Sequence, residues 1–152
     1  EWVKELGADT VIDYKKQDYK TIVKDIDMVL DTLGNQYTED AFTVIKNGRK
    51  VITLVGIVDK ETSNRMKLNK IAQLFLAWKR RKITKQIQLK SAYYSLLLMR
   101  ANAKQLNEIT KLVESGKIKT RIDKVFSLNE VLDALLYLKN GRTKGKVVIK
   151  IK

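Results

Sequence analysis

The stretch DMVLDTLGNQYTEDAFTVIKNGRKVITLVG, residues 27–56, decides the fold class of this chain. Its first apolar run, residues 27–30, predicts a strand, and residues 37–45 carry apolar side chains close to helical spacing before KNGRK ends the helix at Gly48. Residues 50–55 then predict a strand buried on both faces, as in a parallel sheet that helices cover on both sides. A strand, a helix and a strand in this order favour an α/β fold.

The flanking segments continue this alternation. Residues 10–14 (TVIDY) are a β-branched run that predicts another strand, and residues 68–85 have an apolar stripe at helical spacing. Residues 92–99 (AYYSLLLM) are a further strand candidate, and KVVIKIK closes the chain as an alternating strand. Because helical connections of this length join parallel strands, we expect an open parallel sheet.

Two later helices have clear boundary signals. Asn102 predicts the start of one helix, which Gly116 ends. Ser127 is followed three residues later by Glu130, the pattern of a reciprocal capping box, and this second helix is expected to end at Gly141.

Composition excludes several kinds of site. The chain has 152 residues, of which 44% are hydrophobic and 32% charged, as in a soluble globular domain. It has no cysteine and no histidine, so disulfides, the usual zinc sites and histidine acid/base chemistry are not expected in this segment. No apolar run is long enough for a membrane span, and we expect no membrane partner.

The net charge of +14 is large enough to attract polyanions. The lysines are spread over every segment, which favours a solvated basic surface over specific binding of nucleic acid or of an anionic membrane. The run KRRK at 79–82 is expected on the solvent face of a helix whose buried stripe includes Phe75, Leu76 and Trp78.

The chain begins within a helix-favouring piece, EWVKEL, that has no capping residue before it. We therefore expect these residues to be part of a longer protein.

Four stretches together resemble one protein superfamily. LGADTVIDYKKQDY, DMVLDTLG, IKNGRKVITLVG and ESGKIKTRIDKVFSLNEVLDALLYLKNGRTKGKVVIKI are similar, in order and spacing, to the cofactor-binding half of the medium-chain dehydrogenase/reductase superfamily, in its zinc-type alcohol dehydrogenase-like and quinone oxidoreductase-like branch. The resemblance implies a Rossmann-like open parallel sheet that is truncated at its N-terminus, because the family's glycine-rich turn is missing. It implies a truncated nucleotide-binding domain over residues 1–116, and a tail over 117–152 that returns to a catalytic domain outside this sequence.

The resemblance also implies cofactor contacts at two strand ends. Tyr14 would lie along the adenosine ribose or its 2′-phosphate, although it also fits a residue that only edges the sheet. Leu33 and Asn35 belong to a loop that would pass the adenine and its ribose, but a turn that needs Gly34 for its geometry explains the same residues.

The nicotinamide end is implied by two further stretches. Val55, Gly56 and Ile57 would carry the backbone past the nicotinamide, where glycine permits close approach of a flat ring. Ser95 and Leu96 align with a second stretch at that end. The same strand, residues 91–99, is where relatives pair edge to edge into a homodimer, so dimerisation is the alternative explanation of its apolar residues.

Arg142 resembles a family arginine near the 2′-phosphate, with Lys15, Lys16 and Lys144 adding positive charge. NADP is therefore the expected cofactor, with NAD possible, although solvated surface charge explains these cations equally well. We assign no catalytic residue, and Asp13, Asp27 and Asp31 are interpreted as structural.

The resulting hypothesis is the nucleotide-binding portion of a cytoplasmic, homodimeric NADPH-dependent oxidoreductase. It would transfer hydride to a quinone or an α,β-unsaturated carbonyl, or act like an alcohol dehydrogenase, while this segment alone would be inactive. The alternative is a non-catalytic basic α/β module that binds an anionic ligand or nucleic acid.

Overall fold

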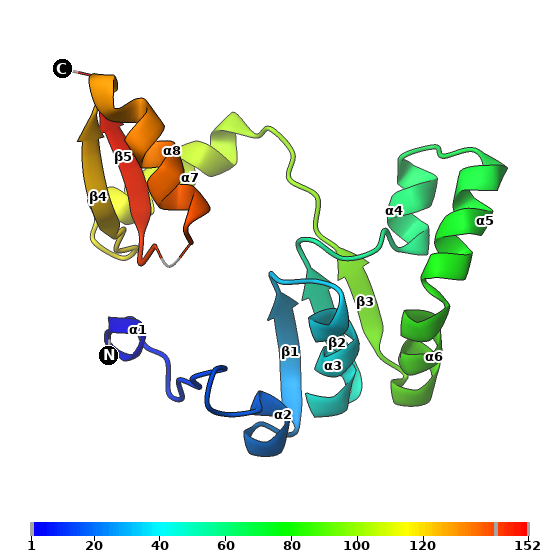
Figure 1. Cartoon of the computed structure of the whole chain (residues 1–152). Coiled ribbons are helices and arrows are strands. Elements are labelled where there is room, and N and C mark those ends of the chain that lie inside the picture. Colours follow the sequence, from blue (N-terminus) through cyan, green and yellow to red (C-terminus); the bar gives the residue numbers. More distant parts are fainter. Residues whose placement is uncertain (1, 142, 152) are drawn as a thin grey trace. The chain divides into compact units, whose positions relative to one another are not determined.

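The computed structural model describes residues 2–141 and 143–151. The chain forms two compact units (Figure 1). One unit comprises residues 8–100 and is called the sheet unit. The other combines residues 1–7 with residues 101–152 and is called the terminal unit.

Three parallel strands form the sheet of the sheet unit, in the order β1 (Ile26–Asp31), β2 (Ile45–Thr53) and β3 (Tyr93–Leu96). The pairing of β1 with β2 is irregular near the start of β1. Ile26 pairs with Ile45 and Met28 pairs with Lys50, so four residues of β2 lie opposite Asp27 alone. Asp27 forms ion pairs with Lys46 at 3.2 Å and with Arg49 at 3.1 Å across this irregularity. The strands confirm the predicted α/β fold with a parallel sheet.

Five helices belong to the sheet unit: α2 (Tyr19–Ile22), α3 (Gln36–Val44), α4 (Lys60–Arg65), α5 (Lys70–Lys79) and α6 (Arg81–Lys90). Helices α3 and α6 contact each other and β2 (Figure 1). Their apolar side chains enclose a core with the middle of the sheet and the start of β3. The core residues are Ala41, Phe42, Ile45, Val51, Ile83 and Ala92.

The terminal unit holds a second parallel sheet, made of β4 (Ile122–Ser127) and β5 (Lys146–Lys150). Its helical segments are α1 (Trp2–Glu5), α7 (Ala103–Glu114), the 3-10 turn η1 (Leu128–Glu130) and α8 (Val131–Lys139). The side chain of Asn102 accepts a hydrogen bond from the amide of Gln105 at 3.2 Å, so it caps α7 as predicted. The capping box of Ser127 and Glu130 is also confirmed, but it opens η1 before α8 begins.

Several predicted elements differ in the structure. Residues 10–14 do not form a strand. A strand needs a neighbour for its backbone hydrogen bonds, and β1 pairs with β2 alone in the described part of the chain. Strand β4 was not predicted, because its lysine and aspartate interrupt the apolar pattern.

Strand β2 is buried on one face only. Val51 and Thr53 are fully buried, whereas on the opposite face Lys50 is exposed and Ile52 is only half-buried, so the prediction of two buried faces was wrong. The reason lies in the helices: α3 and α6 pack on the face of Val51, and Met28 and Leu30 of the neighbouring strand remain more than half exposed.

The predicted buried stripe of the 68–85 helix is also wrong in part. The pattern is divided between α5 and α6, and Phe75 and Trp78 are exposed, while Leu76 is half-buried. The sequence pattern identified the apolar residues of this helix, but no described element packs over Phe75 and Trp78, which remain exposed.

Helix α7 is grouped with the terminal unit, whose second segment begins at Ala101. This grouping describes packing within the chain, and the division into domains at Gly116 stays a prediction.

Candidate functional site

The carboxyl ends of the three parallel strands meet in one row. Asp31, Thr53 and Leu96 are register partners across β1, β2 and β3. The next residues continue the row, because the Leu54 amide donates to the Asp31 carbonyl and the Leu97 amide donates to the Thr53 carbonyl, both at 2.9 Å. The loops that follow the three strands therefore leave the sheet side by side, which is where open α/β folds bind ligands.

A buried carboxylate organises the first of these loops. Asp31 accepts hydrogen bonds from the amides of Leu33 and Gly34, each at 2.9 Å, and from the hydroxyls of Thr38 and Thr53. Burial disfavours its charged form, but the four donated hydrogen bonds outweigh burial and hold the pKa of Asp31 below its ordinary value. Asp31 thus joins β1, the following loop, α3 and β2 through one charged group.

A second buried carboxylate fixes the end of β3. Asp59 caps α4 by accepting hydrogen bonds from the amide and the hydroxyl of Thr62. It also accepts a hydrogen bond from the Leu96 amide at 2.9 Å. Burial raises its pKa, but these hydrogen bonds lower it further than burial raises it, so the pKa of Asp59 lies below the usual range. The loop after β2 is therefore tied to the end of β3.

Close contacts bring the first two loops together. A Cβ added at Gly34, which has φ of +75°, would lie 3.0 Å from Val55 Cγ2 and 3.1 Å from the Val55 carbonyl oxygen. Asn35 follows with φ of +52° and caps α3 without a side-chain hydrogen bond. Left-handed backbone at a residue other than glycine costs free energy, and such residues are frequent at ligand sites.

Gly56 lies against the side chains of its own sheet. A Cβ there would be 2.5 Å from Thr53 Cγ2 and 2.5 Å from the Tyr94 hydroxyl oxygen. Tyr94 donates its hydroxyl to the Ile57 carbonyl at 2.7 Å. Burial, with added repulsion from the charges of Asp59 and Asp31, raises the pKa of Tyr94 to about 12, so the phenol stays protonated and keeps this hydrogen bond.

A pocket of about 560 Å³ opens beside the end of β1. Tyr14 and Leu33, predicted from separate stretches of sequence, both line it. Its other lining residues are Ile12, Tyr19, Val29, Leu30, Asp31, Thr32 and Tyr37. The pocket is mainly apolar and aromatic, with Asp31 and Thr32 among its few polar lining residues, which suits a flat heterocycle.

The remaining predicted residues lie in different settings. Ser95 is exposed within β3, whereas Leu96 is buried at its end. Ile57 is half-buried against the core. Arg142 lies outside the described residues. Among the described residues, the predicted positions do not all line one pocket. The loops that carry Leu33, Asn35, Val55 and Gly56 nevertheless start from neighbouring strand ends.

Sequence reasoning missed three residues that shape this edge: Thr53, Asp59 and Tyr94. Asp31 was interpreted as structural, in agreement with its hydrogen bonds. The motif D-x-x-[TS] at residues 59–62 is a helix-capping pattern that local sequence does reveal. Its link to Leu96 spans 37 residues and has no local signal.

Metal-ligating side chains do not cluster in the part of the chain that the structure describes. Within residues 2–141 and 143–151, no three His, Cys, Asp or Glu side chains come together in a group able to hold a metal ion. Asp31 and Asp59, the buried carboxylates, already accept several protein hydrogen bonds each. In the same residues no helix is long and apolar enough to cross a membrane.

The two buried carboxylates predict how stability depends on pH. The pKa values of Asp31 and Asp59 in the folded chain lie below the ordinary value of 3.8, so the unfolded chain takes up protons first as the solution is acidified. We expect their contribution to the free energy of unfolding to be complete above pH 3.8 and to be lost as the pH falls through the lower folded values. Urea unfolding at a series of acidic pH values measures this loss.

The control for this pH dependence is Asp59→Asn, which removes one of the two titrating groups. The variant should be less stable at neutral pH but should lose less free energy on acidification. If the variant loses as much free energy of unfolding on acidification as the wild-type chain does, Asp59 does not contribute to the pH dependence.

Comparisons with known proteins show which protein family the chain matches. A profile described as "Zinc-binding dehydrogenase" matches residues 6–149. The chain is 30% identical over 151 residues to a 2-methylene-furan-3-one reductase of Solanum lycopersicum, covering 98% of this chain and 30% of the relative. It is 28% identical over 151 residues to a chloroplastic NADPH-dependent alkenal/one oxidoreductase of Arabidopsis thaliana, again covering 98% and 30%.

Among solved structures, the quinone oxidoreductase from Coxiella burnetii superposes with a TM-score of 0.73 at 23% identity. The match covers 99% of this chain and 41% of that structure, and it confirms a Rossmann-like fold. The chain spans 30% of the length of the two curated relatives.

Proposed function

The chain belongs to the zinc-binding dehydrogenase family, and from this premise we propose that it is the part of an NADPH-dependent oxidoreductase that holds both ends of the dinucleotide. The observation that carries the proposal is the aligned row of Asp31, Thr53 and Leu96. The three loops that follow these residues lie at the carboxyl edge of the parallel sheet, which is the edge at which such folds bind nucleotides.

The described residues fit the adenosine end of such a cofactor. Tyr14 and Leu33 line an apolar, aromatic pocket beside β1, where an adenine ring would be stacked and kept from water. Asn35, with its positive φ and a side chain that makes no capping hydrogen bond to α3, would offer polar groups to the ribose.

At the nicotinamide end, Val55 and Ile57 would offer backbone groups to the carboxamide. The chain has no G-x-G-x-x-G, so the usual cradle for the pyrophosphate is not supplied by these residues.

The nicotinamide would supply the hydride, and this chain would contribute binding, orientation and exclusion of water. Tyr94 and Asp59 act here as positioning residues, because they fix Ile57 and Leu96 by hydrogen bonds at 2.7 Å and 2.9 Å. An α,β-unsaturated carbonyl is the substrate class we propose, since one relative is named a 2-methylene-furan-3-one reductase and another an alkenal/one oxidoreductase. A quinone is the second possibility, on the strength of the fold match alone.

Zinc does not fit the part of the chain that the structure describes. The sequence has neither cysteine nor histidine, and its two buried carboxylates are occupied by protein hydrogen bonds. We therefore derive no catalytic step through zinc, although the family takes its name from that metal.

A homodimer through β3 and a cytoplasmic location belong to the same proposal. Strand β3 is an edge of the three-stranded sheet in the order β1, β2, β3, so its outer side faces no further strand of the described residues. A second copy could extend the sheet there.

Cofactor choice is tested at Arg142. We expect Arg142→Glu to weaken NADPH binding to this chain by about tenfold or more, with little change for NADH, because a guanidinium contact to a phosphate contributes about 1.5–3 kcal/mol. Titration of the chain with each dinucleotide, followed by fluorescence or calorimetry, measures the two affinities.

The matched control is Lys139→Glu, which makes the same charge change at an exposed position of α8. Equal losses for NADPH and NADH would remove the NADP assignment. Wild-type chain that binds neither dinucleotide, but binds duplex DNA with a steep dependence on salt, would overturn the proposal in favour of a basic binding module. Oxidation of NADPH by these 152 residues alone would contradict the expectation that the segment is inactive.

A further inference from the structure

Helix α5 carries an exposed apolar face with regular spacing. Ile71, Leu74, Phe75 and Trp78 follow one another at i, i+3, i+4 and i+7 and are between 54% and 82% exposed. Such a stripe normally faces a protein core. Here the inner side of α5 is the half-buried side of Ala72, Gln73 and Leu76, and the apolar stripe is left at the surface.

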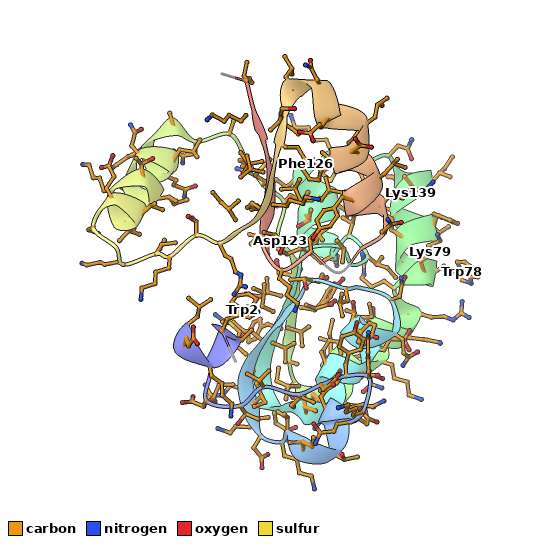
Figure 2. All side chains as sticks on the ribbon, turned by 60° about the vertical axis from the view of Figure 1, so that its left-hand side comes forward. Trp2, Trp78, Lys79, Asp123, Phe126 and Lys139 are labelled. Atoms are coloured by element: carbon orange, nitrogen blue, oxygen red, sulfur yellow. The ribbon has the colours of Figure 1, made fainter. Side chains whose placement is uncertain are left out.

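Two cations border this face, and the sequence around it is strongly basic. Residues 62–90 contain no aspartate or glutamate and nine basic residues, namely Arg65, Lys67, Lys70, Lys79, Arg80, Arg81, Lys82, Lys85 and Lys90. The Lys79 ammonium lies 5.0 Å from the centre of the Phe75 ring, and the Arg81 guanidinium lies 4.9 Å from that of Trp78. Figure 2 shows Trp78 and Lys79 projecting outward from α5.

The acidic groups near these helices do not neutralise the face. Glu39 of α3 pairs with Lys82 at 3.6 Å, and the Asp59 carboxylate is buried in its own hydrogen bonds. Glu61 lies on α4, outside the acid-free stretch. The stripe and its border therefore present aliphatic and aromatic side chains together with uncompensated positive charge.

The sequence alone predicted no membrane partner, but from the exposed stripe and its bordering cations we propose that α5 docks this protein onto an anionic lipid surface. Such a surface takes up apolar side chains between its headgroups while its negative charge attracts the lysines and arginines around them. Nucleic acid shares the charge but offers no layer that would accept Ile71 and Leu74. A second copy of this face would bring the same cations together, and their repulsion opposes that pairing.

The test uses the 152-residue chain and vesicles of two compositions. We expect it to bind vesicles of phosphatidylcholine mixed with phosphatidylserine about a hundredfold or more tighter than vesicles of phosphatidylcholine alone, since several cations approach the surface. In a Trp2→Phe background, Trp78 is the single tryptophan, and its emission should shift to the blue on the anionic vesicles.

Two variants separate docking through α5 from general attraction by the net charge. Ile71→Asn with Leu74→Asn should weaken vesicle binding about tenfold and abolish the blue shift, because the apolar contact is lost. The matched control, Leu132→Asn with Leu135→Asn, changes two exposed leucines of α8 and should leave both unchanged.

Equal binding to neutral and anionic vesicles would overturn the proposal, as would equal losses in the two pairs of variants. So would an unshifted Trp78 on bound vesicles, which indicates adsorption by charge alone. Duplex DNA binding that depends on Ile71 and Leu74 would assign the face to nucleic acid instead. Self-association in the absence of vesicles, lost in the α5 variant, would assign it to a second copy.

Discussion

Asp31→Ala should reduce the free energy of unfolding by about 3–5 kcal/mol, a large fraction of the stability of a domain of this size. The carboxylate accepts hydrogen bonds from two amides and two hydroxyls, and its removal leaves the three buried donors, on Gly34, Thr38 and Thr53, without this acceptor. The loss should include the turn at Leu33 and Gly34 that shapes the proposed cofactor pocket. Urea unfolding followed by circular dichroism measures it.

The same strand supplies the control. Asp27 is also an acidic residue of β1, but it is exposed and forms surface ion pairs with Lys46 and Arg49, so Asp27→Ala should cost about 1 kcal/mol or less. Asp31→Asn keeps one acceptor oxygen and should fall between the two, which leaves the prediction measurable if the alanine variant does not fold. Equal losses at positions 27 and 31 would contradict the role given to Asp31.

Gly56→Ala should destabilise the chain by about 3 kcal/mol, since the added methyl group has no space. It would lie 2.5 Å from Thr53 Cγ2 and from the Tyr94 hydroxyl oxygen, so β2 or β3 must shift. Because Tyr94 donates to the Ile57 carbonyl, the shift would also disturb the loop proposed to pass the nicotinamide.

A double variant in which residues 53 and 94 are smaller tests whether this steric clash is the cause. Thr53→Ser with Tyr94→Phe removes the two atoms that lie 2.5 Å from the new Cβ, and it keeps the hydroxyl oxygen of residue 53, which lies 2.9 Å away. In that background Gly56→Ala should cost about 1 kcal/mol, and the difference between the two costs is the steric coupling. If the cost is the same in both backgrounds, Gly56 is required for another reason. The glycine would then be free to serve close approach of a ligand.

Local patterns predicted the elements of this chain better than its burial. The spacing of residues 37–45 indicated α3, and Asn102, Ser127 and Glu130 marked helix starts that the structure confirms. These signals depend on neighbours within one turn, so the sequence contains all of their physical causes.

Contacts between distant residues were less predictable. The β-branched run at residues 10–14 has strand propensity but no strand beside it, and propensity alone does not supply hydrogen-bond partners. The stripe of Phe75 and Trp78 showed that α5 is amphipathic but not which face would be covered. Likewise, the distance of 37 residues between Asp59 and Leu96 hid the hydrogen bond that ties two loops of the proposed site.

The division into two units also determines the order in which the two sheets can form during translation. Residues 8–100 are continuous, so the ribosome can release every strand of the three-stranded sheet before it has made residue 101. The terminal unit follows a different schedule. Strand β4 pairs with β5, which lies at residues 146–150, and therefore cannot pair until those residues have been translated. The loops of the proposed nucleotide site can form on the nascent chain while the rest of the polypeptide is still being made.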